Sequence, residues 1–490
     1  MAFLDPLYHL LNAAIGRKQD FDQLIETRDI SRIMQKMDSH SEQIAEAVRE
    51  YYPRTHKINL REDKIILDKK GNFKRKIKRW KLPIDYPKYI NEIALVFLYG
   101  KPVVWGQSSE GTDEAFAAFS KLVRDIRLNA KLRQCKRIAG ACTQSAMLFR
   151  VFRNDEGKAD CQIKVLNPLQ GDEIYTRWDQ YDNIISMGWG YYLTEGEDSV
   201  YHFDLFTKET IYHCRRSGLG WEIAEEDNMI GKIPVILFQQ EKEWAGAEPL
   251  IYREEYIASR TADTNDYFSD PMLILDADII KNLPDKDDEN KTLIKSGGES
   301  TQAAAGFLTW DNAPQSKKEE IAWLQNHILS KTFTPNVDFE NMKSLSNVTG
   351  KALKQMMILA EIKASKHKET HDELLHRTGN LMKAIIGNVL DVSLKSQCDK
   401  LDLTHEFQSP FGEDMAEMID MLTKAKDSGI LSTESAVEKS PLTEDTQKEM
   451  DRLEEDGEKK AAEQRDIFAQ YQNEDEGLVE DDEEQTKQAV

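Results

Sequence analysis

The chain has 490 residues, of which 87 are Asp or Glu and 65 are Lys or Arg, and its formal net charge is −22 at pH 7. With 40% hydrophobic and 31% charged residues, it has the composition of a globular protein with a well-hydrated surface, long enough for several domains. The acidic balance disfavours a protein that reads DNA sequence through a basic face. It is compatible with an acidic wall that repels phosphate and lets a duplex slide.

The cysteines and the N-terminal residues limit the class of protein further. The five cysteines are widely spaced and form no CxxC pair, so neither a disulfide framework nor a zinc knuckle is supported. Cys135 and Cys142 stand two helical turns apart, which favours packing in a core. The start lacks the basic region and unbroken apolar run of a signal peptide. The most apolar segment, 93–99, is too short to cross a bilayer, so we expect a reduced protein made in a cytoplasm.

The first half of the chain is expected to mix helices with strands. Polar, cap-like residues precede apolar ones near its start, and a basic run, KKGNFKRKIKRWK at 69–81, then ends before Pro83. GKPVVW at 100–105 ends a strongly apolar helix and opens a strand, and β-branched and aromatic residues alternate from residue 147 onward. The expected helices are 21–25, 31–34, 41–52, 86–99 and 112–146. The expected later strands are 147–153, 162–166, 184–192, 199–205, 210–214 and 233–238.

Two helices that bracket a small strand insert are expected next. The first runs over 247–269 and the second begins at 315, with short strands expected between them at 271–275, 292–295 and 306–310. A polar loop containing Pro335 follows the second helix.

A much longer helix, 351–391, comes after that loop. Its apolar residues recur at steps of three and four once His367 and His371 are included, so one face is a continuous stripe. Gly379 is the expected weak point for a bend. Shorter helices at 412–427, 433–439 and 443–455 follow, and the acid-rich end, 473–484, is expected to be disordered.

Five patches in this order resemble the portal proteins of siphophage-like tailed bacteriophages. They are ALVFLYGKPV at 94–103, IAGAC with AMLFRVF and VLNP between 138 and 168, GKIPVILF at 231–238, LSNVTGKAL at 345–353, and GILSTESA at 429–436 with the SPLTED and EMDRLEE segments that follow it. Thr349 stands where the family often has Ser, and its hydroxyl can still cap the helix.

The resemblance implies an α+β protein with the portal fold. Its parts would be an α+β wing, a two-helix stem, a small β-containing clip, a tunnel loop, a long helix and a helical crown. Their expected residues are 1–246 for the wing, 247–269 and 315–333 for the stem, 270–314 for the clip, 334–349 for the tunnel loop, 350–403 for the long wing helix, 404–460 for the crown and 461–490 for an acidic tail.

The function implied by the resemblance is structural and not enzymatic, and it requires no cofactor. Twelve subunits would close a ring at one capsid vertex, through which double-stranded DNA is packaged and later ejected, irrespective of its sequence. The implied partners are the terminase large subunit, the major capsid protein, the scaffolding protein and the head-to-tail adaptor or neck proteins, with no membrane. The protein would reside in the virion, after synthesis in the cytoplasm of a bacterial host.

Two groups of residues are predicted to make the functional contacts. In the tunnel loop, Lys343 is the only cation between residues 334 and 349, and neutral side chains accompany it. Such a sparse set of donors would contact phosphate without gripping it. The predicted DNA-contacting residues are Asn341, Met342, Lys343, Ser344 and Asn347. The residues predicted to dock the motor and the neck are Asp285, Lys286, Asp287, Asp288 and Glu289 of the clip.

The main alternative is a metal-dependent enzyme. His367 and His371 have the i, i+4 spacing of helical metal ligands, but no glutamate stands where HExxH requires it, and both lie on the apolar stripe. Packing at a helix seam is therefore the favoured interpretation of these histidines.

Other motif-like segments fail for lack of single residues. The segment before Lys351 lacks the first glycine of a P-loop, because Leu345 occupies that position. The acidic segment at 285–289 lacks the glycine and the closing glutamate of a calcium loop. The basic run at 69–81 fits either a surface strand or a nucleic-acid contact.

Overall fold

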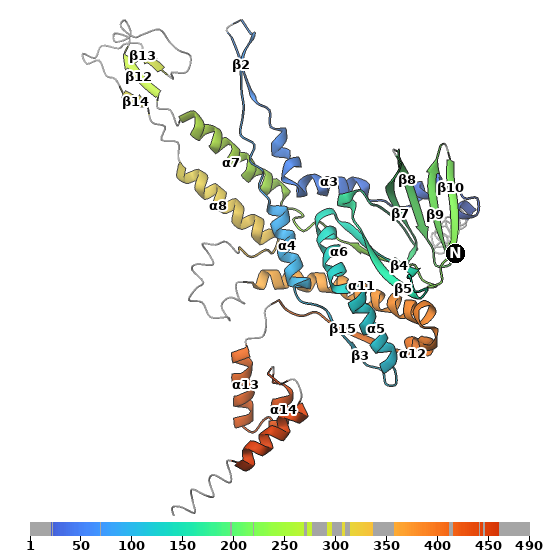
Figure 1. The fold of residues 1–490 in the computed structure, drawn as a ribbon. Coiled ribbons are helices and arrows are strands. Elements are labelled where there is room, and N and C mark those ends of the chain that lie inside the picture. The colour runs from blue at the N-terminus through green and yellow to red at the C-terminus, as the bar shows by residue number, and fades with distance from the viewer. Residues whose placement is uncertain are drawn as a thin grey trace, which may run out of the picture. The chain divides into compact units, whose positions relative to one another are not determined.

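The computed structural model describes residues 21, 23–68, 70–196, 198–218, 220–268, 272–276, 292–295, 306–308, 314–336, 357–410, 415–440, 442–443 and 446–459. The chain forms two compact units, Met1–Pro410 and Phe411–Val490. Both helices and strands build the first unit (Figure 1), which confirms the expected α+β class, whereas the described part of the second unit is helical.

Short helices and a hairpin open the first unit. Its helices before the main sheets are α2 (Ile30–Lys36), α3 (Ser41–Tyr51), α4 (Tyr86–Tyr99), α5 (Asp113–Asp125) and α6 (Leu128–Cys142), with 3₁₀ turns η1 (Pro53–Thr55) and η2 (Lys57–Leu60). The strands of this region are β1 (Lys64–Leu67), β2 (Phe73–Ile77) and β3 (Val104–Gln107), of which β1 and β2 form an antiparallel pair. The helix expected at 86–99 is confirmed.

Two antiparallel sheets form the middle of the chain. The larger has the strand order β10-β9-β8-β7-β6 and the smaller the order β11-β4-β5. Their strands are β4 (Gln144–Arg153), β5 (Ala159–Leu166), β6 (Glu173–Trp178), β7 (Ile184–Glu195), β8 (Asp198–Phe206), β9 (Thr210–Ser217), β10 (Gly220–Asp227) and β11 (Val235–Gln239), with the 3₁₀ turn η3 (Pro168–Gln170) after β5. All six expected strands are present, and β6 and β10 were missed.

The remaining elements begin with the helix α7 (Glu248–Phe268). The small insert then contributes β12 (Met272–Asp276), β13 (Thr292–Lys295) and β14 (Gly306–Leu308) in the order β13-β12-β14, before helix α8 (Pro314–Lys331). The first unit ends with α11 (Ile358–Ile385), the π-helical turn η5 (Ile386–Leu390), η6 (Val392–Leu394), α12 (Lys395–Lys400) and β15 (Leu403–Glu406). The second unit holds α13 (Met415–Asp427), α14 (Thr433–Glu438) and a further helix at 446–459.

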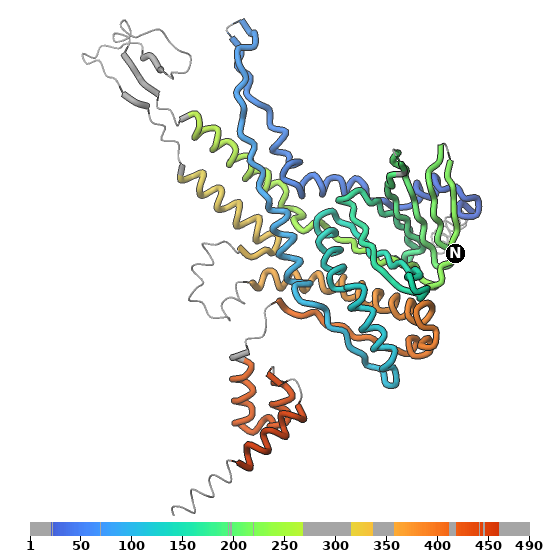
Figure 2. The backbone as a smooth tube through the Cα atoms, viewed as in Figure 1, coloured from blue at the N-terminus to red at the C-terminus, as the bar shows by residue number. Residues whose placement is uncertain are grey.

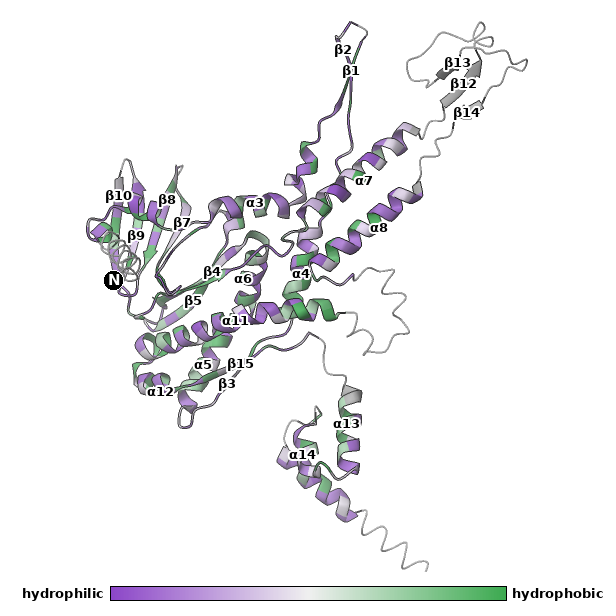
Figure 3. Ribbon diagram, turned by 180° about the vertical axis from the view of Figure 1, so that it is seen from behind, coloured by the Kyte–Doolittle hydropathy of each residue, from purple (hydrophilic) through white to green (hydrophobic). Residues whose placement is uncertain are grey.

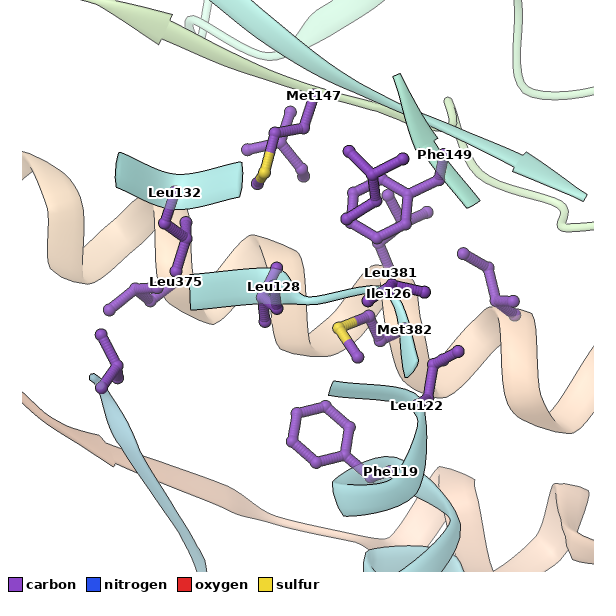
Figure 4. Packing of buried hydrophobic residues seen from close by; sticks show 14 of the residues in the cluster. Phe119, Leu122, Ile126, Leu128, Leu132, Met147, Phe149, Leu375, Leu381 and Met382 are labelled. Carbon is purple, nitrogen blue, oxygen red and sulfur yellow. The ribbon is translucent and has the colours of Figure 1, made fainter. Parts of the chain in front are cut away.

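The main hydrophobic core lies where α4, α5, α6 and β4 meet α11. Figure 4 shows Leu375, Leu381 and Met382 of α11 among residues from α5, α6 and β4, including Leu132 and Met147. These positions explain the apolar stripe of the long helix, because that stripe is the face turned toward the core. Figure 3 shows α4 as largely hydrophobic, whereas α7 and α8 alternate between hydrophobic and hydrophilic residues.

The single helix expected over 112–146 is wrong, because the chain forms two separate helices there, α5 and α6. Arg127 adopts a left-handed backbone conformation with φ of 53°, which ends α5 and lets α6 start in a new direction. No glycine or proline marks this position, so no local signal predicts the break.

The long helix also departs from its expected form. It runs regularly through Gly379, where an added Cβ would lie 3.1 Å from Leu403 and 3.4 Å from Trp105, and the irregular turn is η5 instead. Close packing therefore accounts for this glycine, and no bend occurs there. Residues 403–406 pair with β3 as β15, so residues 404–410 lie in the first unit and not with the C-terminal helices.

Candidate functional site

Both groups of predicted site residues, 285–289 and the five positions within 341–347, lie outside the described residues. The structure does describe the elements that hold these segments. Helices α7 and α8 enclose the segment with β12–β14, and α8 and α11 flank the residues between Asn336 and Met357. The contacts of these flanking elements determine how each segment is held.

Helices α7 and α8 lie side by side in the views of Figures 1 and 3. The exposed side chain of Arg253 on α7 donates two hydrogen bonds, of 3.0 and 2.8 Å, to Glu320 of α8. Deeper in the pair, Gln325 of α8 donates to the buried carboxylate of Glu254 at 3.0 Å. Burial raises the pKa of Glu254, although the hydrogen bond from Gln325 opposes the shift. These polar contacts fix the register of one helix against the other.

A buried carboxylate attaches α7 to the segment between η1 and α4. Glu255 lies 2.6 Å from Nδ1 of the buried His56 and accepts a hydrogen bond of 2.9 Å from the backbone of Ile84. One turn further, the hydroxyl of Ser259 accepts a bond from the backbone of Leu82 at 3.0 Å. Since all these groups are buried or half-buried, breaking them would leave polar groups without partners, and α7 is held firmly along this side.

The chain that leaves α8 is also fixed before the predicted loop begins. The hydroxyl of Thr332 donates back to Ile328 at 2.8 Å, and Phe333 takes a left-handed conformation with φ of 52°. Tyr89 of α4 then donates to the carbonyl of Pro335 at 2.9 Å. Thr334 and Pro335 are buried, so the loop expected to start at residue 334 has an anchored first turn.

A cluster of buried charges secures α11, which starts after the loop. Glu243, in the turn after β11, contacts Lys136 of α6 and lies 2.7 Å from Lys363 and 3.2 Å from His367 of α11. The side chain of Lys136 is 0% exposed and that of Glu243 is 1% exposed. One carboxylate thus joins three parts of the fold. Because an isolated charge is costly to bury, each of these groups depends on the others.

The charge cluster shifts the pKa values of its members in ways that follow from burial and pairing. Burial opposes ionisation of Glu243, but the positive charges of Lys136 and Lys363 outweigh it and hold the pKa of the carboxyl well below its usual value. Burial lowers the pKa of Lys136, and Glu243 resists that shift. Burial also lowers the pKa of His367 and that of His371. Both histidines are therefore neutral near pH 7.

The two histidines occupy the seam between α11 and its neighbours, as their place on the apolar stripe predicted. Nδ1 of His371 lies 2.9 Å from the hydroxyl of Tyr99 in the core, and His367 turns toward Glu243. Within the described part of the chain, no three His, Cys, Asp or Glu side chains gather in a way that could hold a metal ion. The histidines serve as polar links in the packing of α11.

Sequence reasoning missed Lys136 and Glu243 as partners of these histidines. One signal was available, because Lys136 lies between Leu132 and Ala139, which share the buried face of α6. A lysine on an apolar face requires a buried acid, although the sequence does not say which one.

Comparison with known protein families gives one match. The family model described as phage portal protein, SPP1 Gp6-like, matches residues 32–463, which is most of the chain. No curated protein matches the chain. Among the described residues, no helix combines the length and hydrophobicity that a bilayer crossing requires.

Proposed function

The chain belongs to the SPP1 Gp6-like family of phage portal proteins, and on this premise we propose that it closes into a ring that conducts double-stranded DNA. Its function is that of a phage portal, and the family is structural and not enzymatic. The proposed ring has twelve copies and occupies one vertex of the capsid. DNA enters through it during packaging and leaves through it at ejection.

The observation that carries the proposal is the set of anchored elements on either side of 337–356. Two paired helices, α7 and α8, bracket the strands β12–β14, and α8 leads through an anchored turn toward α11. We assign the stem to the two helices, the clip to 270–314 and the tunnel loop to 334–349. The chain is anchored at Pro335 before the loop and at Lys363 and His367 of α11 after it, which supports a loop that reaches a set radius in a ring.

In this proposal the loop contacts the DNA backbone. Asn341, Met342, Lys343, Ser344 and Asn347 face the bore, and Lys343 provides one cation per subunit. Contacts from a single cation and neutral donors position phosphate without reading bases. They weaken as salt rises, because counterions replace the lysine at the phosphates. A duplex can then move past the loop without being held at one register.

The partners follow from the two ends of the proposed ring. The acidic and basic residues at 285–289 dock the terminase motor, which supplies the ATP hydrolysis, and later the neck proteins. The outer parts meet the major capsid and scaffolding proteins. Before assembly the subunits are in the host cytoplasm. No observation favours the metal-enzyme alternative, since His367 and His371 are engaged with Glu243 and Tyr99.

Native mass spectrometry of the purified chain tests the ring. Twelve copies of a 56.4 kDa subunit give a species of about 680 kDa. A monomer or dimer at every concentration would refute the ring, and stoichiometric metal on that small species would favour the enzyme. Packaging assays with Lys343→Ala then test the loop. We expect changed DNA retention with unchanged ring mass, and Lys318→Ala on α8 serves as the matched control.

A further inference from the structure

The hairpin of β1 and β2 exposes an unusual number of apolar side chains. Every residue of β2 is exposed, and Phe73 is 65% exposed. Ile65 and Leu67 of β1 are also exposed, and cross-strand pairing places Leu67 opposite Phe73. Figure 2 shows the hairpin as a narrow projection whose tip has no other described element against it. A two-stranded hairpin alone is marginally stable in water, and exposed apolar side chains mark interaction surfaces. We therefore expect a partner to cover this hairpin.

The base of the hairpin, in contrast, is clamped to helix α7. Arg61 pairs with Asp263 at 2.6 Å, and its guanidinium also donates to the backbone of Trp80 at 2.9 Å. The backbone of Trp80 donates to Asp263 at 2.8 Å, and its indole donates to Asp266. Lys76 is tied to Asp63 at 3.1 Å across the two strands. The clamp sets the direction of the hairpin while its apolar tip stays uncovered.

The charge of the hairpin is opposite to that of the rest of the chain. Residues 64–81 contain nine Lys and Arg and one Asp, which gives a formal charge of +8. Since the whole chain has a net charge of −22, the other residues together have a net charge of −30. Among the described residues, the side chains of Lys74 and Arg75 make no hydrogen bond or ion pair. A partner that combines apolar contacts with negative charge would satisfy both features.

We propose that the β1–β2 hairpin is an arm that binds a second copy of this chain. A second copy has the complementary negative charge and is present wherever the first one is. Duplex DNA also offers negative charge, but it provides no partner for exposed Ile65 and Leu67, which makes a protein surface the better fit. The inference rests on the proposed ring, in which each subunit has a neighbour, and it identifies an element that joins neighbours.

Photo-crosslinking in a mixed-isotope preparation tests the arm. The full-length chain carries a photo-reactive phenylalanine analogue at position 73, and ¹⁴N and ¹⁵N subunits are mixed before assembly. The expected product is a crosslinked peptide pair with one light and one heavy member. The same analogue at Tyr181, which is 75% exposed in the turn before β7, is the control for chance contact and should give at least tenfold less product. Products that are only same-isotope, or only adducts with added DNA, would overturn the proposal.

Native mass measured on the same samples separates this inference from the ring itself. Ile65→Thr/Leu67→Thr/Phe73→Thr keeps residues that suit a strand while removing the apolar contacts. We expect its half-assembly concentration to rise at least tenfold, whereas Tyr192→Thr/Leu193→Thr, at exposed positions of β7, leaves it unchanged. A ring that forms equally well with the triple variant overturns the arm and leaves the ring standing. A wild-type chain that stays monomeric overturns both.

Discussion

Replacing Glu243 with Gln removes the one negative charge from a cluster of buried cations. The side chain keeps its shape, but Lys136 loses its counter-charge and is left with neutral acceptors such as the Gln240 oxygen at 2.7 Å and Nε2 of His367 at 3.5 Å. Because the Lys136 side chain is 0% exposed, it cannot turn to water, whereas that of Lys363 is 12% exposed and can partly do so. Removing one partner of a buried pair costs about 3–5 kcal/mol, and we expect a loss of that size.

Two companion variants test which loss in the free energy of unfolding is larger and whether the losses add. Lys136→Met should cost less than Glu243→Gln, because Glu243 still has Lys363 at 2.7 Å and His367 at 3.2 Å. Combining the two changes should cost less than the sum of the single losses, since neither charge is then left buried alone. Glu46→Gln is the control. Its side chain is 69% exposed, and we expect a change within about 0.5 kcal/mol.

Urea unfolding followed by tryptophan fluorescence measures these differences, since the buried Trp244 adjoins the cluster. All variants are compared at one protein concentration, because assembly adds to apparent stability. A loss below about 1 kcal/mol for Glu243→Gln would show that the cluster is hydrated or rearranges freely. Strict additivity in the double variant would refute the coupling between Lys136 and Glu243.

Three further predictions concern other parts of the first unit. Burial holds the pKa of His371 well below its unfolded-state value of 6.5. The stability that the neutral side chain contributes is therefore complete above pH 6.5 and is lost as pH falls toward the folded-state pKa. Between pH 7 and 5, the urea midpoint should fall less steeply for His371→Gln than for the wild-type chain. The five cysteines are free and buried, and burial raises the pKa of four of the thiols to about 12, so a thiol reagent should react slowly with the folded chain and label all five after denaturation. An added Cβ at Gly140 would lie 2.0 Å from Oδ1 of Asn91, so Gly140→Ala should lower the free energy of unfolding by about 1–3 kcal/mol. As a control, Gly220→Ala should change it by less than about 0.5 kcal/mol, because Gly220 has open space around it.

Sequence patterns were sufficient to predict helices and strands wherever the signal lies in neighbouring residues. The apolar run at 86–99 predicted α4 with its observed bounds, and six strands were placed by alternation of side chains, because burial of one face imposes a period that neighbouring residues reveal. The ordered family patches likewise identified the portal family without any contact being known. The residues predicted to touch DNA and the motor remain predictions.

Tertiary structure decided which distant groups meet. Glu243 contacts His367, a residue 124 positions later, and no local pattern pairs them. The same holds for β15, whose partner β3 comes almost 300 residues earlier, and for the break at Arg127, which no glycine or proline marks in the sequence. The sequence alone determined the family and those elements whose side chains show a clear period, because periodicity is a property of neighbours. Only the folded chain determined the pairing of buried charges and the exposed hairpin, because these depend on which surfaces come together in space.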